Sequence, residues 1–247
     1  MSHFTGTPRL TDDDILARLL YRDGMMLVVD KPAGVPVHAG PKGGPSLEAS
    51  FDALRFGLPG PPYLAHRLDR DTSGCLVLGR HAKALAKLGK MFAGGRITKT
   101  YWAVVEGTPP AQEGRIDQPL RKLNKVSGWR VAADPSGQPA TTLYRVLGRH
   151  DNLTWVELSP LTGRTHQLRA HMALLGCPIL GDENYGPIPG DTGGRMLHLL
   201  ARSITIPLYD KRPPIIVTAP VPAHMLEALT LCGFREVLTN KPENGAE

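Results

Sequence analysis

Short runs of apolar residues alternate with turn-rich segments along most of the chain, and they predict a protein with many short strands. Four apolar residues follow one another at 26–29, and a similar run at 75–79 ends in glycine, as buried strands between turns do. Elsewhere apolar and polar residues alternate, which is typical of half-buried strands. The predicted strands are residues 26–30, 75–79, 100–106, 141–147 and 153–158, together with part of 196–206.

Five helices are predicted from the spacing of apolar residues and from capping residues or glycines at their ends. They cover residues 12–20, 46–54, 82–92, 165–175 and 222–232. The helix at 82–92 carries two stripes, an apolar one of Leu85, Leu88 and Phe92 and a basic one of Lys83, Lys87 and Lys90. We expect an α/β (α+β) fold: a single domain with a largely antiparallel mixed sheet flanked by helices and loops. It covers residues 21–235, after an N-terminal arm and short helix at 1–20 and before a polar tail at 236–247.

The composition of the chain argues against several classes of protein. With 247 residues and 41% hydrophobic content, the chain can bury a substantial core. Its apolar runs fall well short of the ~18 residues of a membrane-spanning helix, and its first ten residues lack the apolar core of a secretory signal. A cytoplasmic location is therefore expected. The three cysteines form no CxxC pair, which argues against a zinc ribbon or a disulfide framework.

The charge distribution favours a polyanionic partner. Lysine and arginine outnumber aspartate and glutamate by 29 to 23, and no acidic residue lies between Asp71 and Glu106. Because the basic residues of that stretch gather on one helix stripe, an anion-binding surface is favoured over a merely solvated face. A second basic island contains Arg121, Lys122, Lys125 and Arg130, and an ordinary solvated loop explains it equally well.

The densest polar cluster is the segment His66–Gly74, HRLDRDTSG, which lies between a proline-rich loop and a buried strand. Arginines beside a carboxylate keep it ionised, and an ionised carboxylate in a partly dry site serves as nucleophile, base or electrostatic stabiliser. The alternative is an ion-paired turn in which Asp71 caps its own loop. Composition alone does not separate the two interpretations.

A second cluster is Leu161–His171, LTGRTHQLRAH. Gly163 permits an unusual backbone turn there, and Arg164, Thr165 and His166 then lie at the positive end of the following helix. A helix cap with surface arginines is the alternative. A metal site at His166 and His171 is not favoured, because residues five apart lie about 140° apart around a helix. No phosphate-binding glycine motif is present, so a nucleotide cofactor has no support.

At these two clusters the chain resembles the RluA-type pseudouridine synthases. HRLDRDTSG followed by CLVL resembles the signature of that family, and GRTHQLR resembles its later block. Weaker matches follow the family order at 29–34 (VDKPAG), 99–103 (KTYWA), 181–186 and 197–207, so the resemblance runs from about residue 22 to 208. Because about twenty residues precede the pattern, the resemblance implies a member with the catalytic domain alone, without an S4-type RNA-binding domain.

The resemblance implies isomerisation of uridine to pseudouridine in ribosomal or transfer RNA, by base flipping, without cofactor or metal and with no obligatory protein partner. It makes Asp69 the catalytic carboxylate, pairs Arg164 with it and stacks Tyr101 on the uracil, where Tyr101 would help with the C5 proton. Leu197 would supply an apolar pocket wall, and Arg67 would fill the space left by the flipped base. His66 is expected among the substrate-binding residues, where a buried, hydrogen-bonded histidine is favoured over a proton carrier. Phosphate contacts are expected from Lys83, Lys87, Lys90, Arg121 and Lys122.

Two other functions compete with this interpretation. In an extended segment Asp69 and Asp71 would share a face, which suits the paired carboxylates of a glycosidase. That hypothesis leaves the neighbouring arginines, the basic surface and the second cluster unexplained. A non-catalytic RNA-binding module would need the basic surface but not Asp69.

Overall fold

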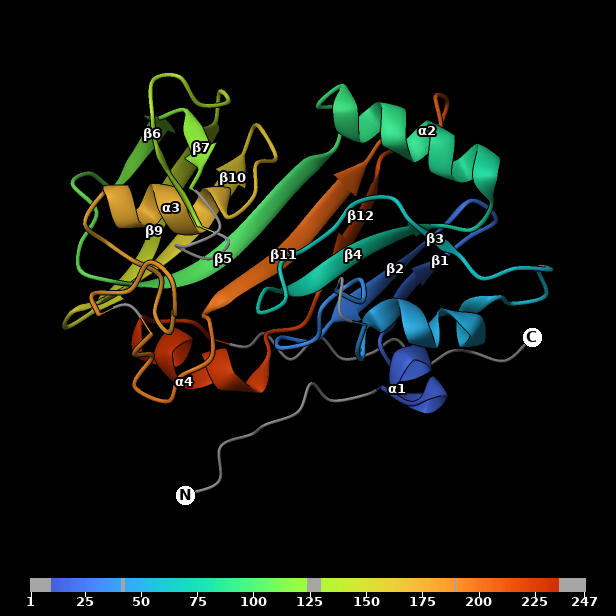
Figure 1. The fold of residues 1–247 in the computed structure, drawn as a ribbon, viewed down its shortest axis with the longest axis horizontal. Helices are drawn as coiled ribbons and strands as arrows, with labels where there is room; N and C mark the ends of the chain where they lie inside the picture. Colours follow the sequence, from blue (N-terminus) through green and yellow to red (C-terminus); the bar gives the residue numbers. More distant parts are fainter. Residues whose placement is uncertain (1–9, 41–42, 124–129, 189, 236–247) are drawn as a thin grey trace.

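A ten-stranded sheet crosses the whole molecule (Figure 1). The computed structural model describes residues 10–40, 43–123, 130–188 and 190–235. The main path of the sheet runs β1-β2-β4-β11-β5-β10-β9-β6, while β3 pairs with β4 and β12 with β11. Its strands are β1 (Leu19–Arg22), β2 (Met26–Lys31), β3 (Tyr63–Leu64), β4 (Ser73–Gly79), β5 (Thr98–Glu106), β6 (Glu113–Asp117), β9 (Thr141–His150), β10 (Leu153–Pro160), β11 (Leu199–Ile206) and β12 (Ile215–Thr218). A separate pair consists of β7 (Leu120–Lys122) and β8 (Val131–Ala133).

Helices cover both faces of this sheet. They are α1 (Asp12–Ala17), the 3-10 helix η1 (Leu47–Leu54), α2 (Ala82–Ala93), α3 (Gln167–Leu174) and α4 (Ala223–Leu231). Side chains of β4 alternate between the two faces: Cys75 and Val77 pack with α2 and α4, whereas Leu76 and Leu78 pack with α1 and η1. Tyr101 of β5 touches both the α1–η1 core and the core beneath α3, so these helices share one face. Among the described residues, no helix has the length and apolar character needed to cross a membrane.

The expected fold class is confirmed, since the sheet is mixed and antiparallel except where β4 runs parallel to β11 in the part of the chain that the structure describes. The strands and helices predicted from periodicity are present, with shifted ends. The prediction that the first helix extends through residues 19–20 is wrong. Helix α1 ends at Ala17, and Leu19 pairs with Val29 in the sheet. The predicted helix at 46–54 is a 3-10 helix, and its Ser46 makes no side-chain cap. The short strands β1, β3, β6, β7, β8 and β12 were not predicted.

The parallel contact between β4 and β11 depends on a glycine. Gly74 pairs with Ala201 and has φ +102°, a conformation that residues with a side chain rarely adopt. A Cβ atom at this position would lie 2.3 Å from the carbonyl oxygen of Ala201. The last residue of the HRLDRDTSG segment therefore lets the preceding loop start its strand directly against β11.

Replacing Gly74 by alanine should lower the free energy of unfolding by on the order of 3 kcal/mol, because strain and overlap add. Gly89 is a matched control, since it lies within α2 and a Cβ there meets no atom within 4 Å. Gly89→Ala should raise the free energy of unfolding by up to about 1 kcal/mol. Urea denaturation measures both variants, and a Gly74→Ala protein as stable as the parent would contradict the packing described.

Candidate active site

A cavity of about 600 Å³ opens where the loop between β3 and β4 meets β5, the end of α2 and the turn before α3. The first cluster contributes His66, Arg67 and Asp69, and the second contributes residues 161–164 and 166–169. Tyr101 and Leu199 lie on strands that face the same space. Asp69 is the one carboxylate among the described residues that line this cavity. The two sequence clusters, about a hundred residues apart, thus form one site.

Asp69 is held by charge rather than by short hydrogen bonds. Its Oδ2 lies 3.8 Å from Nη1 of Arg169 and 3.9 Å from Nε2 of His166. The Asp69 side chain is 25% exposed, whereas that of Arg169 is 4% exposed. A carboxylate in this position stays close to a fixed positive charge while its oxygens remain free to approach a bound molecule.

Arg169 is fixed by a second carboxylate, that of Asp182. Its Nε and Nη2 atoms donate to the two oxygens of Asp182 at 2.7 Å each, which makes a bidentate pair. The Asp182 side chain is fully buried. Asp182 also accepts hydrogen bonds from the backbone N–H groups of Asn184 and Tyr185. Because these bonds fix the guanidinium plane, the remaining Nη1 is left facing Asp69.

The predicted pairing of Arg164 with Asp69 is wrong. Arg164 lies in the exposed turn before α3, and its Nε donates to the carbonyl of Pro139 at 3.0 Å. Arg169 lies inside the helix on its buried face, which directs its guanidinium to the carboxylate. Gly163 also differs from expectation: its φ is not in the left-handed region, which His166 occupies instead with φ 52°.

Polar contacts lock the start of α3 in place. The side-chain amide of Gln167 donates to Thr141 O and Thr142 Oγ1, and its oxygen accepts from the Arg164 N–H and the Thr162 hydroxyl. His166 Nδ1 lies 3.3 Å from the Tyr185 hydroxyl, which itself accepts from a backbone N–H. This contact orients the ring so that its other nitrogen, Nε2, lies on the side of Asp69. Burial lowers the pKa of His166, and the Asp69 charge opposes this shift.

The walls of the cavity come from Tyr101, Leu168 and Leu199. Leu197, which was predicted as a wall, does not border the cavity, whereas Leu199 at the start of β11 does. Both side chains are 3% exposed and pack in the core beneath α3, so the predicted wall lies two positions further along the chain. Burial and the nearby Asp69 charge raise the pKa of Tyr101, so its hydroxyl keeps its proton at neutral pH.

His66 fits the expected role of a hydrogen-bonded histidine. Its Nε2 accepts from the backbone N–H of Val77 at 3.0 Å, and its ring packs 4.6 Å from that of Phe92. Burial, with a smaller effect of the Lys99 charge, lowers the pKa of His66 to about 3, so the ring is neutral near pH 7. Arg67, by contrast, is exposed and borders both this cavity and a neighbouring one.

Asp71 lies outside the main cavity, although Asp69 and Asp71 both border the neighbouring one. The two oxygens of Asp71 accept from Nε and Nη2 of Arg70 at 3.0 and 3.2 Å. It borders the neighbouring cavity of about 650 Å³ on the other side of the loop. Asp71 is thus paired with its neighbour Arg70, and the described residues that line the main cavity do not include the paired carboxylates of a glycosidase.

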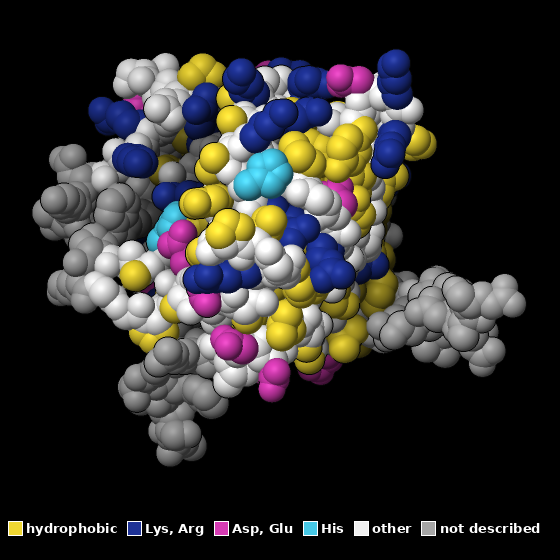
Figure 2. Space-filling model, turned by 90° about the vertical axis from the view of Figure 1, so that its right-hand side faces the viewer, with side chains coloured by type: hydrophobic (Ala, Val, Ile, Leu, Met, Phe, Trp, Pro, Cys, Tyr) yellow, Lys and Arg dark blue, Asp and Glu magenta, His cyan; other side chains and the backbone are white. Residues whose placement is uncertain are grey.

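The predicted phosphate-binding residues lie outside the main cavity. Lys83, Lys87 and Lys90 share one side of α2, and Phe92, which borders the cavity, lies about 180° from Lys83 around the helix axis. Figure 2 shows Lys and Arg side chains along the upper edge of the molecule, where α2 lies. The Lys87 ammonium is 5.9 Å from the ring centre of Tyr209. RNA binding by this stripe stays a prediction.

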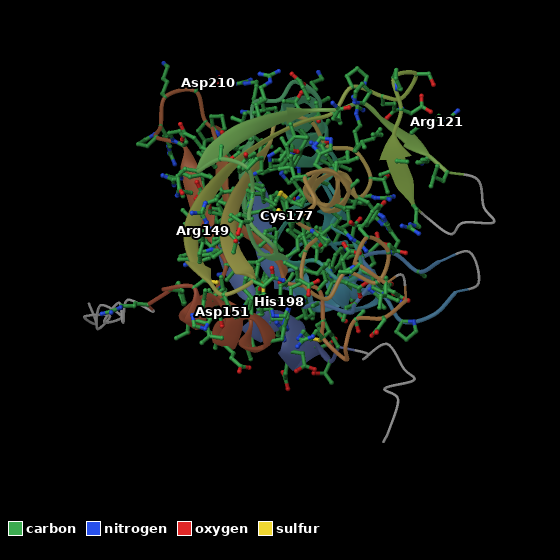
Figure 3. All side chains as sticks on the ribbon, turned by 90° about the vertical axis from the view of Figure 1, so that its left-hand side faces the viewer. Arg121, Arg149, Asp151, Cys177, His198 and Asp210 are labelled. Carbon is green, nitrogen blue, oxygen red and sulfur yellow. The ribbon has the colours of Figure 1, made fainter. Side chains whose placement is uncertain are left out.

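The second basic island is only partly described. Arg121 pairs with Asp134 at 2.7 Å, and Figure 3 shows it on β7, at the edge of the molecule. Lys122 borders the neighbouring cavity, and Arg130 stacks on Tyr185. Lys125 lies outside the described residues. Within those residues no three His, Cys, Asp or Glu side chains gather as a metal site requires.

Lys31 is a positioning residue that the sequence did not single out. It is fully buried, and its ammonium donates to the carbonyls of Pro32, Val35 and Arg70 at 2.7–2.8 Å. These bonds tie the turn after β2 to the loop that carries Asp69. Burial lowers the pKa of Lys31 to about 7, and the charges of Asp71 and Asp69 oppose the shift. The sequence signal that could have revealed it is a lysine directly after the predicted strand at 26–30 and just before proline and glycine.

Lys31→Met should lower the free energy of unfolding by on the order of 3 kcal/mol, because three buried carbonyls lose their donor. Urea denaturation measures the change. Lys83→Met on the exposed side of α2 is the control, and its effect should stay within about 0.5 kcal/mol. Equal stability of the two variants would show that the Lys31 contacts do not hold the loop.

Comparisons with known proteins agree with this site. A family model described as RNA pseudouridylate synthase matches residues 25–174. An uncharacterised RNA pseudouridine synthase of Zymomonas mobilis is 43% identical over 219 residues, which cover 88% of this chain and 97% of the relative. The ribosomal large subunit pseudouridine synthase C of Vibrio cholerae is 36% identical over 220 residues, 86% of this chain and 68% of the relative.

A solved structure shares the fold. Human RNA pseudouridylate synthase domain containing 4 matches with a TM-score of 0.76 and 26% sequence identity, covering 90% of this chain and 95% of the human one. The family model covers more than half of the chain, and the family-like motifs meet at one cavity. The chain therefore belongs to the RNA pseudouridylate synthase family, which makes it an isomerase and confirms the RluA-type resemblance of its motifs.

Proposed function

We propose that this enzyme converts a uridine of ribosomal RNA to pseudouridine, with Asp69 as the catalytic carboxylate. The observation that carries the proposal is the placement of Asp69 in the cavity, beside a guanidinium that Asp182 holds in place. The choice of ribosomal RNA rests on the relative in Vibrio cholerae, whose name assigns it to the large ribosomal subunit. Transfer RNA is the alternative substrate.

The uridine must leave its stack to reach this cavity. Base flipping costs a few kcal/mol, which phosphate and stacking contacts repay. A cavity of about 600 Å³ has the size of a small-molecule site and accepts a single nucleotide. Arg67, exposed at the rim, is placed to fill the vacated space in the RNA.

The reaction breaks the bond between N1 and C1′, turns the uracil, and joins C5 to C1′. The proton that C5 loses is balanced by the one that N1 gains, so no electrons enter or leave. Asp69 either attacks C1′ or removes a ribose proton; in both routes the Arg169 guanidinium, 3.8 Å away, lies beside the reacting carboxylate.

Tyr101 retains the detached base. Its ring forms part of the cavity wall, and an aromatic ring stacks favourably on a flat base. Since its hydroxyl stays protonated, it serves as a donor or a link in a proton path rather than as a strong base. His166 Nε2 lies 3.9 Å from the same carboxylate oxygen, so its ring is a second polar neighbour of Asp69.

Asp69→Asn should abolish pseudouridine formation, a loss of at least about 10³-fold in rate, since the amide is neither base nor effective nucleophile. RNA from cells that lack the gene is incubated with the enzyme, and pseudouridine is mapped along it. Binding of that RNA should stay within about threefold, because phosphate contacts supply most affinity.

Asp71→Asn is the matched control, since its carboxylate is bound by Arg70 outside the cavity. It should retain most of the activity. Turnover by Asp69→Asn would remove Asp69 from its role. Isomerisation of transfer RNA alone would move the substrate to the alternative class.

A further inference from the structure

Lys99 brings a positive charge into the active-site cavity without meeting a negative one. It lies on β5 two residues before Tyr101, so both side chains project from the same face of the sheet. Both border the cavity. Among the residues that the structure describes, none forms a hydrogen bond or an ion pair with the Lys99 ammonium.

Other buried cations of this enzyme are paired. Lys31 donates to three carbonyls, and Arg169 binds Asp182 through two short bonds. A half-buried ammonium without a partner is unfavourable unless a ligand supplies the missing charge. Burial lowers the pKa of Lys99.

The turn before α3 leaves space beside this ammonium. A Cβ atom on Gly163 would lie 3.8 Å from Lys99 Nζ, so any larger side chain would occupy the adjoining volume. The backbone of Gly163 does not require a glycine, because its φ is outside the left-handed region. The missing side chain therefore keeps Lys99 accessible from the cavity.

The charges around the cavity indicate an anionic ligand group. Four cationic side chains border it, Arg67, Lys99, Arg164 and Arg169, against the carboxylate of Asp69. Uracil and ribose are neutral, and the phosphodiester carries the charge of a nucleotide. The Cα atoms of Lys99 and Tyr101, whose ring is proposed to hold the base, are one strand repeat apart, about 6.5–7 Å. That separation is comparable to the span from base to phosphate within one nucleotide.

We propose that Lys99 binds the phosphate group next to the target uridine and thereby holds the flipped nucleotide while Asp69 acts on the ribose. The assignment rests on the proposed function of this cavity, which it deepens by naming the residue that anchors the substrate backbone. A hydrogen bond from Lys99 to a uracil carbonyl is the competing contact.

Binding of uridine 5′-monophosphate, uridine 3′-monophosphate and uridine, followed by NMR titration, separates the two contacts. The parent enzyme should bind at least one monophosphate about fivefold or more tighter than uridine, as expected for one ion pair near a solvated surface. Lys99→Met should remove this preference and leave uridine binding unchanged. Lys99→Arg should retain the preference, and so should the control Lys211→Met, an exposed residue that borders neither cavity.

The outcomes separate this assignment from the proposed function. If the phosphate preference depends on Lys99 while ribosomal and transfer RNA remain unmodified, the assignment stands and the proposed reaction fails. If Lys99→Met keeps the preference, or if the parent enzyme shows none, the assignment is overturned. An equal loss for uridine and both monophosphates overturns it too, because it would place Lys99 on the uracil. Melting temperatures of the variants establish that each is folded.

Discussion

One guanidinium shared by two carboxylates is the interaction on which the active site depends. Asp182 takes two of the three nitrogens of Arg169 in short, buried hydrogen bonds, and Asp69 lies 3.8 Å from the third. The two carboxylates therefore differ in how closely they approach the guanidinium, and this difference matches their different roles. The buried one fixes the geometry of the guanidinium, and the partly exposed one remains free to approach a bound molecule.

The fold brings the members of this arrangement together from distant parts of the chain. Asp69 precedes β4, Arg169 belongs to α3, and Asp182 follows in the turn after that helix. Gly74 allows β4 to start directly against β11, and Lys31 ties the loop between β3 and β4 to the end of β2. Gln167 fixes the start of α3 to β9. The loop and the helix are therefore held separately, and the charge pair joins two rigid supports.

Much of this was predictable from the sequence. Long periodic segments such as β9, β10 and α2 were predicted because each has enough residues to show its period. Strands such as β3 and β7 have only two or three residues. They are defined by their hydrogen bonds to neighbouring strands, which no local sequence pattern reveals. Asp69 and Tyr101 were placed at the cavity by motif resemblance. Arg164 was predicted as the partner of Asp69 from the motif match, whereas Arg169 of the same motif is the buried one, which only the position and direction of α3 reveal.

The most direct test of this account compares the two arginines of that motif in single-turnover pseudouridine formation with enzyme in excess. Arg169→Gln should slow the chemical step by at least about 100-fold, because Asp69 loses its charge partner, whereas Arg164→Gln should stay within about fivefold. Circular dichroism establishes that both variants are folded. Normal turnover by a folded Arg169→Gln enzyme, or a large loss confined to Arg164→Gln, would contradict the assignment of Arg169 as the partner of Asp69.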